Sequence, residues 1–122
     1  MLLAAVAVAG AVGAVLRYLV DRAVQARTKS DVPIGTLVIN VSGAVVLGFL
    51  TGAGLHHHLA AEWVTVFGTG MVGAYTTFST FVYDVRRLLT EDGPASALVN
   101  VAASVLLGLA SAAAGLALGA VV

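Results

Sequence analysis

The 122-residue sequence contains no cysteine, one tryptophan and two prolines, and only 10% of its residues are charged. Without cysteine, the chain can form no disulfide, thiol nucleophile or cysteine-based metal site. Soluble domains carry about 25% charged residues, so this composition excludes a soluble helical bundle. The formal net charge is zero, and the chain therefore lacks the basic surplus that nucleic-acid binding requires.

Catalytic and metal-binding groups are also scarce. The stretches 32–55 and 94–121 contain no carboxylate, and no Ser/His/Asp set or glycine-rich phosphate loop is present. We therefore expect no enzymatic activity. The consecutive histidines His56, His57 and His58 do not converge on one point, as an i, i+4 pair on a helix would. A solvated loop is the expected place for this run.

Apolar residues, in contrast, are abundant: 60% of the chain is hydrophobic, and the mean hydropathy is +1.03. A membrane helix needs about 20 mostly apolar residues, and continuous apolar runs argue against barrel strands. No positive residue precedes the first run, so we interpret it as a retained helix rather than a signal peptide. We predict an all-α membrane protein, a single domain over residues 1–122, with helices over about 2–24, 32–55, 63–89 and 94–121.

Small residues indicate how these helices pack. The second and fourth predicted helices each contain a GxxxG pair, Gly48/Gly52 and Gly115/Gly119. Lipid offers no hydrophobic drive for helix association, so small residues that allow close approach favour packing. We interpret both pairs as helix-packing faces.

The positive charges predict the orientation. All six Lys and Arg fall at the ends of the first and third predicted helices or in the loops that follow them. With four spans, these loops share one side of the membrane. We expect the protein to lie in the cell (plasma) membrane. The positive-inside rule then places the two basic loops in the cytoplasm and both termini outside the cell. The six residues are Arg17, Arg22, Arg27, Lys29, Arg86 and Arg87.

The stretch GTGMVGAYTTFSTFVYD, residues 68–84, is unusually polar for a membrane span. Glycine weakens a helix by about 1 kcal/mol relative to alanine, and irregular backbone in a bilayer must be covered by protein or water. Phe78 and Phe81 share one helix face. They can pack among hydroxyls bonded back to the helix, or their positive ring edges can face an anion. The interleaved hydroxyls are those of Thr76, Thr77, Ser79 and Thr80.

Two further polar residues lie within apolar runs. Asn40 must find a hydrogen-bond partner or face water, and an interhelical bond and a pore-facing donor are equally consistent with it. Arg17 lies near the cytoplasmic end of the first helix, on the side where Asp84 is expected. Arg17 can reach the headgroups or pair with Asp84, or it can form a cationic vestibule that collects anions.

Three motifs together resemble the Fluc (CrcB) family of fluoride channels. They are GAVGAVLRY at 10–18, PIGTLVINVSGAVVLG at 33–48 and GAYTTFSTFVYD at 73–84, in the family's order. TTFSTF with an upstream GTLxxN is a specific signal, whereas the fourth predicted helix matches more loosely. The resemblance implies a fluoride-selective channel in the cell inner membrane. Passive export of cytoplasmic fluoride would then give resistance to fluoride toxicity.

The resemblance also implies an antiparallel dimer of four-helix subunits, with the third helix broken and two narrow pores. A structural Na⁺ at the dimer centre is implied, held by the backbone carbonyls of Gly73 and Thr76. Tyr75 and Asn100 stand where relatives have other residues. Arg17 is implied as an anion vestibule or structural residue. The residues implied along the fluoride path are Asn40, Phe78, Ser79, Thr80, Phe81 and Ser104.

An antiparallel homodimer requires one chain to insert both ways, which needs a weak charge bias. The bias here is six to zero, so our hypothesis pairs the chain with an oppositely oriented homologue rather than a second copy. Small multidrug/proton antiporters are an alternative, but they need a carboxylate within the first helix, and here Asp21 comes only at its end. A non-conducting assembly subunit is the other alternative, which leaves TTFSTF and Asn40 unexplained.

Overall fold

The computed structural model describes residues 1–28, 32–56 and 59–122, and within them the chain is helical without β-strands. The predicted all-α class is therefore confirmed. In chain order the elements are α1 (Leu2–Gln25), α2 (Ile34–His56), α3 (Ala61–Trp63), the π-helix η1 (Val64–Val72), α4 (Gly73–Tyr75), α5 (Phe78–Glu91) and α6 (Pro94–Val121).

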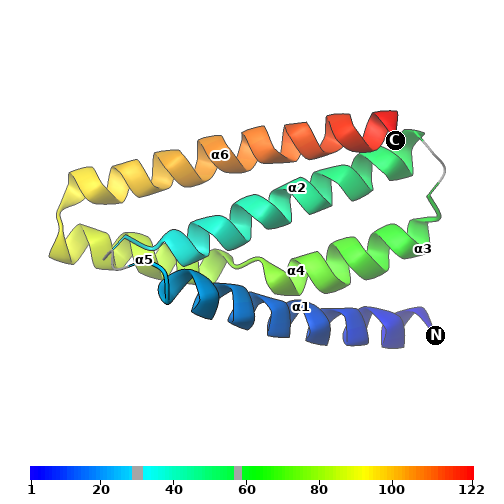
Figure 1. The fold of residues 1–122 in the computed structure, drawn as a ribbon, viewed down its shortest axis with the longest axis horizontal. Coiled ribbons are helices and arrows are strands. Elements are labelled where there is room, and N and C mark those ends of the chain that lie inside the picture. Colours follow the sequence, from blue (N-terminus) through cyan, green and yellow to red (C-terminus); the bar gives the residue numbers. More distant parts are fainter. Residues whose placement is uncertain (29–31, 57–58) are drawn as a thin grey trace.

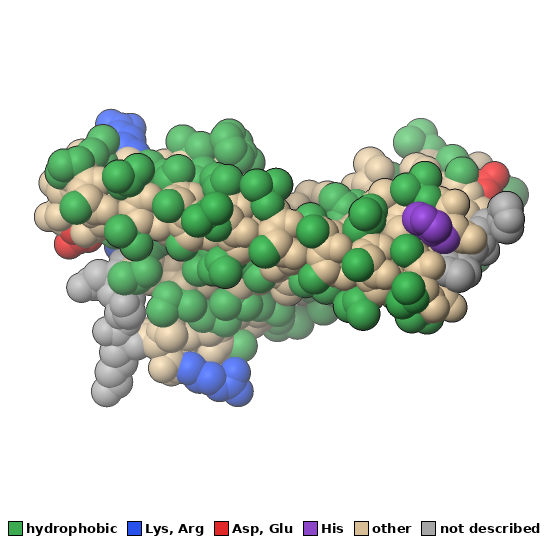
Figure 2. All heavy atoms as spheres, turned by 90° about the horizontal axis from the view of Figure 1, so that it is seen from above, with side chains coloured by type: hydrophobic (Ala, Val, Ile, Leu, Met, Phe, Trp, Pro, Cys, Tyr) green, Lys and Arg blue, Asp and Glu red, His purple; other side chains and the backbone are tan. Residues whose placement is uncertain are grey.

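Within the described ranges, three helices, α1, α2 and α6, are long and apolar enough to cross a membrane, with 24, 23 and 28 residues respectively. Figure 2 shows apolar side chains spread over the whole face in view, whereas the Lys and Arg side chains lie toward one end. Such an apolar exterior suits lipid rather than water. The chain is a multi-pass membrane protein.

The most extensive contact between two helices joins α2 and α6, which lie side by side in Figure 1. A methyl group added at Gly48 would collide with the carbonyl oxygen of Ala112, and one at Gly115 would collide with that of Val45. Gly52 and Gly119 are equally close to the facing backbone. The two GxxxG pairs are thus packing faces, as predicted, and they pack against each other.

The third predicted helix, 63–89, is divided in the structure. The chain is helical from α3 through η1 to α4, and η1 is a nine-residue π-helix, a wider form that is rare beyond one turn. Thr76 (ψ 161°) and Thr77 (φ −147°, ψ 123°) are extended, in the region where the resemblance implies a break. Helix α5 then continues in the same general direction (Figure 1).

Both termini lie at one end of the molecule, and the turn from α5 to α6 lies at the other (Figure 1). Gly93 in this turn has a φ of 92°, which glycine adopts without steric cost. Pro94 follows at the first helical position of α6, where its missing N–H removes no helical hydrogen bond. This turn lets α6 return alongside α2.

Candidate functional site

The side chain of Asn40 is bound to the backbone at the interruption. Its Nδ2 donates a hydrogen bond of 2.9 Å to the carbonyl oxygen of Thr77, and its Oδ1 accepts one of 2.9 Å from the Thr77 N–H. An amide carries two N–H donors, so one remains for another acceptor. Asn40 thus makes the interhelical contact considered above, and it also lines the groove described below.

Two side-chain oxygens, Asn40 Oδ1 and Thr77 Oγ1, take backbone N–H groups away from the carbonyls of Gly73 and Thr76. In an α-helix the Thr77 N–H would donate to the carbonyl of Gly73, but here it donates to Asn40. The Thr80 N–H, which in an α-helix would donate to the carbonyl of Thr76, donates instead to the Thr77 hydroxyl. Carbonyls of unwound helices coordinate Na⁺ in membrane proteins. The backbone at Gly73 and Thr76 therefore fits the cation that the resemblance implies.

Thr77 also begins α5. Its Oγ1 accepts a hydrogen bond of 3.2 Å from the Thr80 N–H and donates one of 3.0 Å to the Thr80 hydroxyl. Ser79 Oγ lies 3.4 Å from the same oxygen. The N-terminus of a helix carries partial positive charge and the C-terminus partial negative charge. At the interruption, the N-terminal end of α5, which favours anions, therefore lies close to the C-terminal end of α4, which favours cations.

Four of the residues predicted for the ion path line one groove of about 390 Å³: Asn40, Phe78, Phe81 and Ser104. The centroids of the two phenyl rings are 5.9 Å apart, and the ring planes are tilted by 42°. Phe78 is 78% exposed, so the groove opens on the surface of the single chain. A few donors among apolar walls and ring edges can bind a small anion without holding it tightly.

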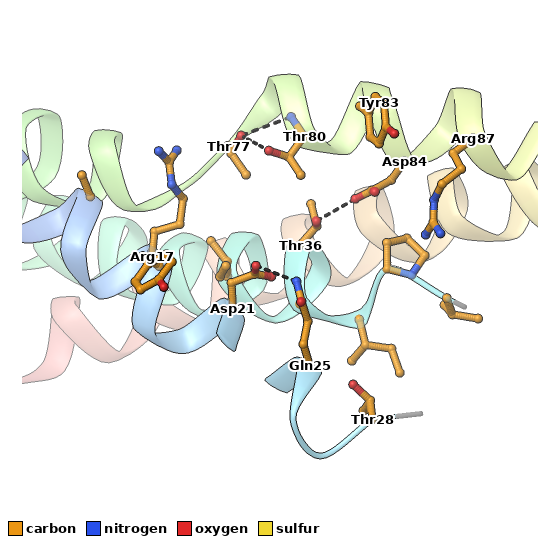
Figure 3. A pocket seen from close by; sticks show the side chains of 17 residues that line it. Arg17, Asp21, Gln25, Thr28, Thr36, Thr77, Thr80, Tyr83, Asp84 and Arg87 are labelled. Carbon is orange, nitrogen blue, oxygen red and sulfur yellow. Dashed lines mark hydrogen bonds between the residues drawn. The ribbon is translucent and has the colours of Figure 1, made fainter. Parts of the chain in front are cut away.

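A polar cavity of about 720 Å³ lies beside this groove, and Thr77 lines both. Its walls come from α1, α2, α5 and the segment before α2, and Figure 3 shows the labelled side chains around it. Two predicted site residues, Arg17 and Thr80, line the cavity. Ser79 is not among the described residues that line the cavity or the groove.

Arg17 and Asp84 share this cavity, but no ion pair joins them in the described part of the chain. Asp84 is 7% exposed, and its Oδ2 accepts a hydrogen bond of 2.7 Å from Thr36 Oγ1. The Arg17 side chain extends from α1 toward the start of α5 in Figure 3. The hydrogen-bond partner of Asp84 is therefore Thr36, and the predicted contact between Arg17 and Asp84 is not found between these two described residues.

The two residues that the resemblance marks as unusual, Tyr75 and Asn100, lie in separate places. The Tyr75 hydroxyl is 2.9 Å from Ser42 Oγ, and this contact ties α4 to α2 next to the interruption. Asn100 is buried on α6, in a groove of about 520 Å³ that Leu88 and Asp92 also line. Asn100 is therefore separate from the groove that contains Ser104.

No group of three or more His, Asp or Glu side chains suited to a metal ion is found within residues 1–28, 32–56 and 59–122. His56 lies in the last turn of α2, with its Nδ1 3.1 Å from the carbonyl oxygen of Gly52. His57 and His58 lie outside the described residues.

Comparison with known families settles the relationship that the motifs indicate. The family described as "CrcB-like protein, Camphor Resistance (CrcB)" matches residues 4–116. The chain belongs to the CrcB family. The matched span includes every residue that lines the groove and the polar cavity.

Relatives within this family are named fluoride-specific ion channels. FluC 2 of Mycobacterium tuberculosis (strain ATCC 25618 / H37Rv) is 48% identical over 103 residues, covering 84% of this chain and 79% of that protein. FluC 1 of Leifsonia xyli subsp. xyli is 43% identical over 115 residues, covering 94% and 84%. FluC of Thermotoga petrophila is 45% identical over 101 residues, covering 79% and 80%.

Thr36, which lines the polar cavity, was not singled out from the sequence, and Thr77 was named only as one of the interleaved hydroxyls. Thr36 lies one helical turn before Asn40, so the i, i+4 spacing could have placed it on the same face. Thr77 has the side chain of a good N-cap, three residues before Thr80. Its pairing with Asn40 uses backbone atoms, which every residue but proline has, and no side-chain pattern could have indicated it.

Proposed function

We propose that this CrcB family member is a subunit of a fluoride-specific ion channel, through which cytoplasmic fluoride leaves the cell passively. One observation carries the proposal. The Asn40 amide, the Phe78 and Phe81 rings and the Ser104 hydroxyl meet in one groove, beside a cavity lined by Arg17. Relatives named as fluoride-specific channels, 43–49% identical over most of the chain, support it.

Fluoride is small and strongly hydrated, so a path must replace the water that the ion loses. Arg17 attracts the anion into the polar cavity, where the Thr80 hydroxyl offers a first donor. The remaining Asn40 N–H and the positive end of α5 then lead toward the ring edges of Phe78 and Phe81. An inside-negative potential supplies about 2.3 kcal/mol per charge per 100 mV for outward movement, so no coupled energy source is needed.

The proposed channel has four membrane crossings per subunit and two antiparallel subunits. The pieces α3, η1, α4 and α5 cover residues 61–91, enough to cross a bilayer as a fourth, interrupted crossing. Irregular backbone at membrane depth has to be buried in protein or line a water-filled cavity. A second subunit over the exposed Phe78 ring would provide this cover and close the groove.

The strong charge bias supports an oppositely oriented homologue as that second subunit. Five of the six Lys and Arg, all but Lys29, are described, and those that Figure 2 shows lie toward the end opposite His56. Two copies of this chain in opposite orientations would place one set of arginines on the side that the positive-inside rule disfavours. A partner with the reverse bias avoids this cost.

A structural Na⁺ between the subunits completes the proposal. The carbonyl oxygens of Gly73 and Thr76 would hold it, because the interruption releases both from helical hydrogen bonds. When bound, the ion supplies a fixed positive charge between the anion paths and satisfies carbonyls that would otherwise lack partners.

The proposal is tested by growth in fluoride of a bacterium that lacks its own fluoride exporter. The chain, expressed with the oppositely biased homologue if one is needed, should allow growth at fluoride concentrations that stop the empty-vector strain. Asn40→Asp should abolish this protection. Gly108→Ala, a change into open space, should leave it intact. Unprotected cells that contain well-expressed, membrane-inserted protein would overturn the proposal.

A further inference from the structure

Asn40 stands where the two helix ends of the interruption meet. Its Oδ1 receives the N–H of Thr77, and its Nδ2 holds the carbonyl of the same residue. The same side chain lines the groove with Phe78. We propose that Asn40 couples the two ion sites, because the amide that serves the anion groove also keeps the Gly73 carbonyl free to bind a cation. This inference rests on the proposed function.

The first step of the argument is a competition for one donor. A backbone N–H buried without a partner is costly, so nearly all such groups are paired. The Thr77 N–H donates to Asn40 Oδ1, whereas in a continuous α-helix it would donate to the carbonyl of Gly73. Without the Asn40 oxygen, the N–H would turn to Gly73 and occupy the carbonyl proposed as a cation ligand.

The second step assigns different tasks to the two ends of the amide. Oδ1 supports the proposed cation site, because it accepts the Thr77 N–H that would otherwise compete for the Gly73 carbonyl. Nδ2 acts on the anion side, because one of its hydrogens anchors the Thr77 carbonyl and the other is left for an anion in the groove. One side chain thus influences both sites through separate atoms.

Helix dipoles reinforce the coupling. The extended residues Thr76 and Thr77 separate the negative C-terminal end of α4 from the positive N-terminal end of α5, and these ends favour a cation and an anion respectively. If the helix became continuous, both partial charges would be lost together. The bonds of Asn40 to Thr77 therefore maintain the electrostatics on which both ions depend.

Two substitutions separate the tasks. Asn40→Asp keeps an oxygen that can accept the Thr77 N–H but loses the N–H donors, so it should remove fluoride flux and leave cation binding in place. Asn40→Leu has the same number and branching of side-chain heavy atoms but neither polar group, so it should remove both. Thr36→Val is the matched control, because it deletes another hydrogen bond between α2 and α5, that to Asp84, without touching Thr77.

The experiment measures thermal unfolding of the purified channel in detergent, in NaCl and in KCl at equal ionic strength, with fluoride flux measured on the same samples. For the wild type, Na⁺ should raise the unfolding midpoint by roughly 5 °C, as expected for a ligand that binds only the folded state. Asn40→Asp and Thr36→Val should retain this Na⁺-dependent shift, and Asn40→Leu should lose it. Only differences between the two salts are compared, so a general loss of stability cancels.

Three results would overturn the inference. One is a Na⁺-dependent shift that Asn40→Leu retains. Another is that Asn40→Asp loses the Na⁺-dependent shift together with fluoride flux. This result can be obtained even if Asn40→Leu fails to fold. The third is a wild-type protein without any Na⁺-dependent shift. If the wild type shows no Na⁺-dependent shift but normal fluoride flux, the proposed function remains intact. If instead the wild type shows a normal shift but no fluoride flux, the proposed function is overturned and the cation site is kept.

Discussion

The Asn40 side chain on α2 and the peptide group of Thr77 ahead of α5 are joined by two reciprocal hydrogen bonds, each 2.9 Å long. Both atoms of the amide are used, so the pairing fixes the position and the orientation of the extended chain. An interruption inside a bilayer is tolerated only where protein or water covers the freed backbone groups. Asn40 pairs with both polar backbone groups of Thr77, and the groove and the polar cavity meet at that residue.

The glycine face between α2 and α6 should be sensitive to a single methyl group. Gly115→Ala would force the backbones apart because the new methyl meets the Val45 carbonyl, and overpacking of this kind costs about 1–3 kcal/mol. Gly108→Ala lies on the same helix with nothing within 4 Å of the added atom and should cost nothing. Unfolding midpoints in detergent, followed by circular dichroism, compare the two. Equal midpoints would contradict the packing account.

The hydrogen bond from Thr36 to Asp84 should stabilise the fold. Thr36→Val keeps the shape of the side chain but leaves the buried Asp84 carboxylate without its donor, at a cost of about 1–3 kcal/mol. Thr36→Ser retains the hydroxyl and should lie close to the wild type. Chemical unfolding in mixed micelles measures the difference. A valine variant as stable as the serine variant would show that the bond contributes little.

The aromatic rings of the groove should matter for transport more than for stability. Phe81→Ile keeps an apolar side chain but removes the positive ring edge, and fluoride flux should fall at least tenfold, or about 1.4 kcal/mol in barrier height. Phe67→Ile is the control, because that ring stacks on Trp63 with centroids 5.6 Å apart and is not among the described residues that line the groove. Flux measured with a fluoride electrode should separate the two variants, and similar losses would argue against a role of the Phe81 ring in the path.

The membrane orientation can be tested directly because the chain has no cysteine of its own. A single cysteine added after Val122 should react with an impermeant maleimide in intact cells. Glu91→Cys, at the end of α5, should react only after the membrane is opened. Labelling of both positions to the same extent in intact cells would mean that the chain inserts both ways, and the case for an oppositely oriented homologue would be lost.

The sequence was informative where a residue conflicts with its surroundings. Asn40 and the TTFSTF segment are polar within apolar runs, and the glycine pairs recur at GxxxG spacing, so each stands out in the sequence alone. The helical class followed from the long apolar runs in the same way. The pairing of Asn40 with the Thr77 backbone could not be predicted, because peptide groups are alike at every position.

The partner of Asp84 shows a second limit. Charge placement suggested Arg17, since opposite charges on one side of a membrane attract, whereas Thr36 is the residue that reaches the carboxylate. Charge alone gives the side of the membrane but not the distance between two side chains. The π-helical η1, which packs against α1 and α2, is a further feature that the sequence pattern did not indicate.

Fluoride efflux from liposomes tests the central claim most directly. Purified chain would be reconstituted alone and, in parallel, with the oppositely biased homologue, and chloride efflux would be measured beside fluoride. The account predicts rapid efflux that favours fluoride over chloride in at least one of the two preparations and is abolished by Asn40→Asp. Folded protein that releases no fluoride in both preparations, or that releases chloride as readily, would contradict it.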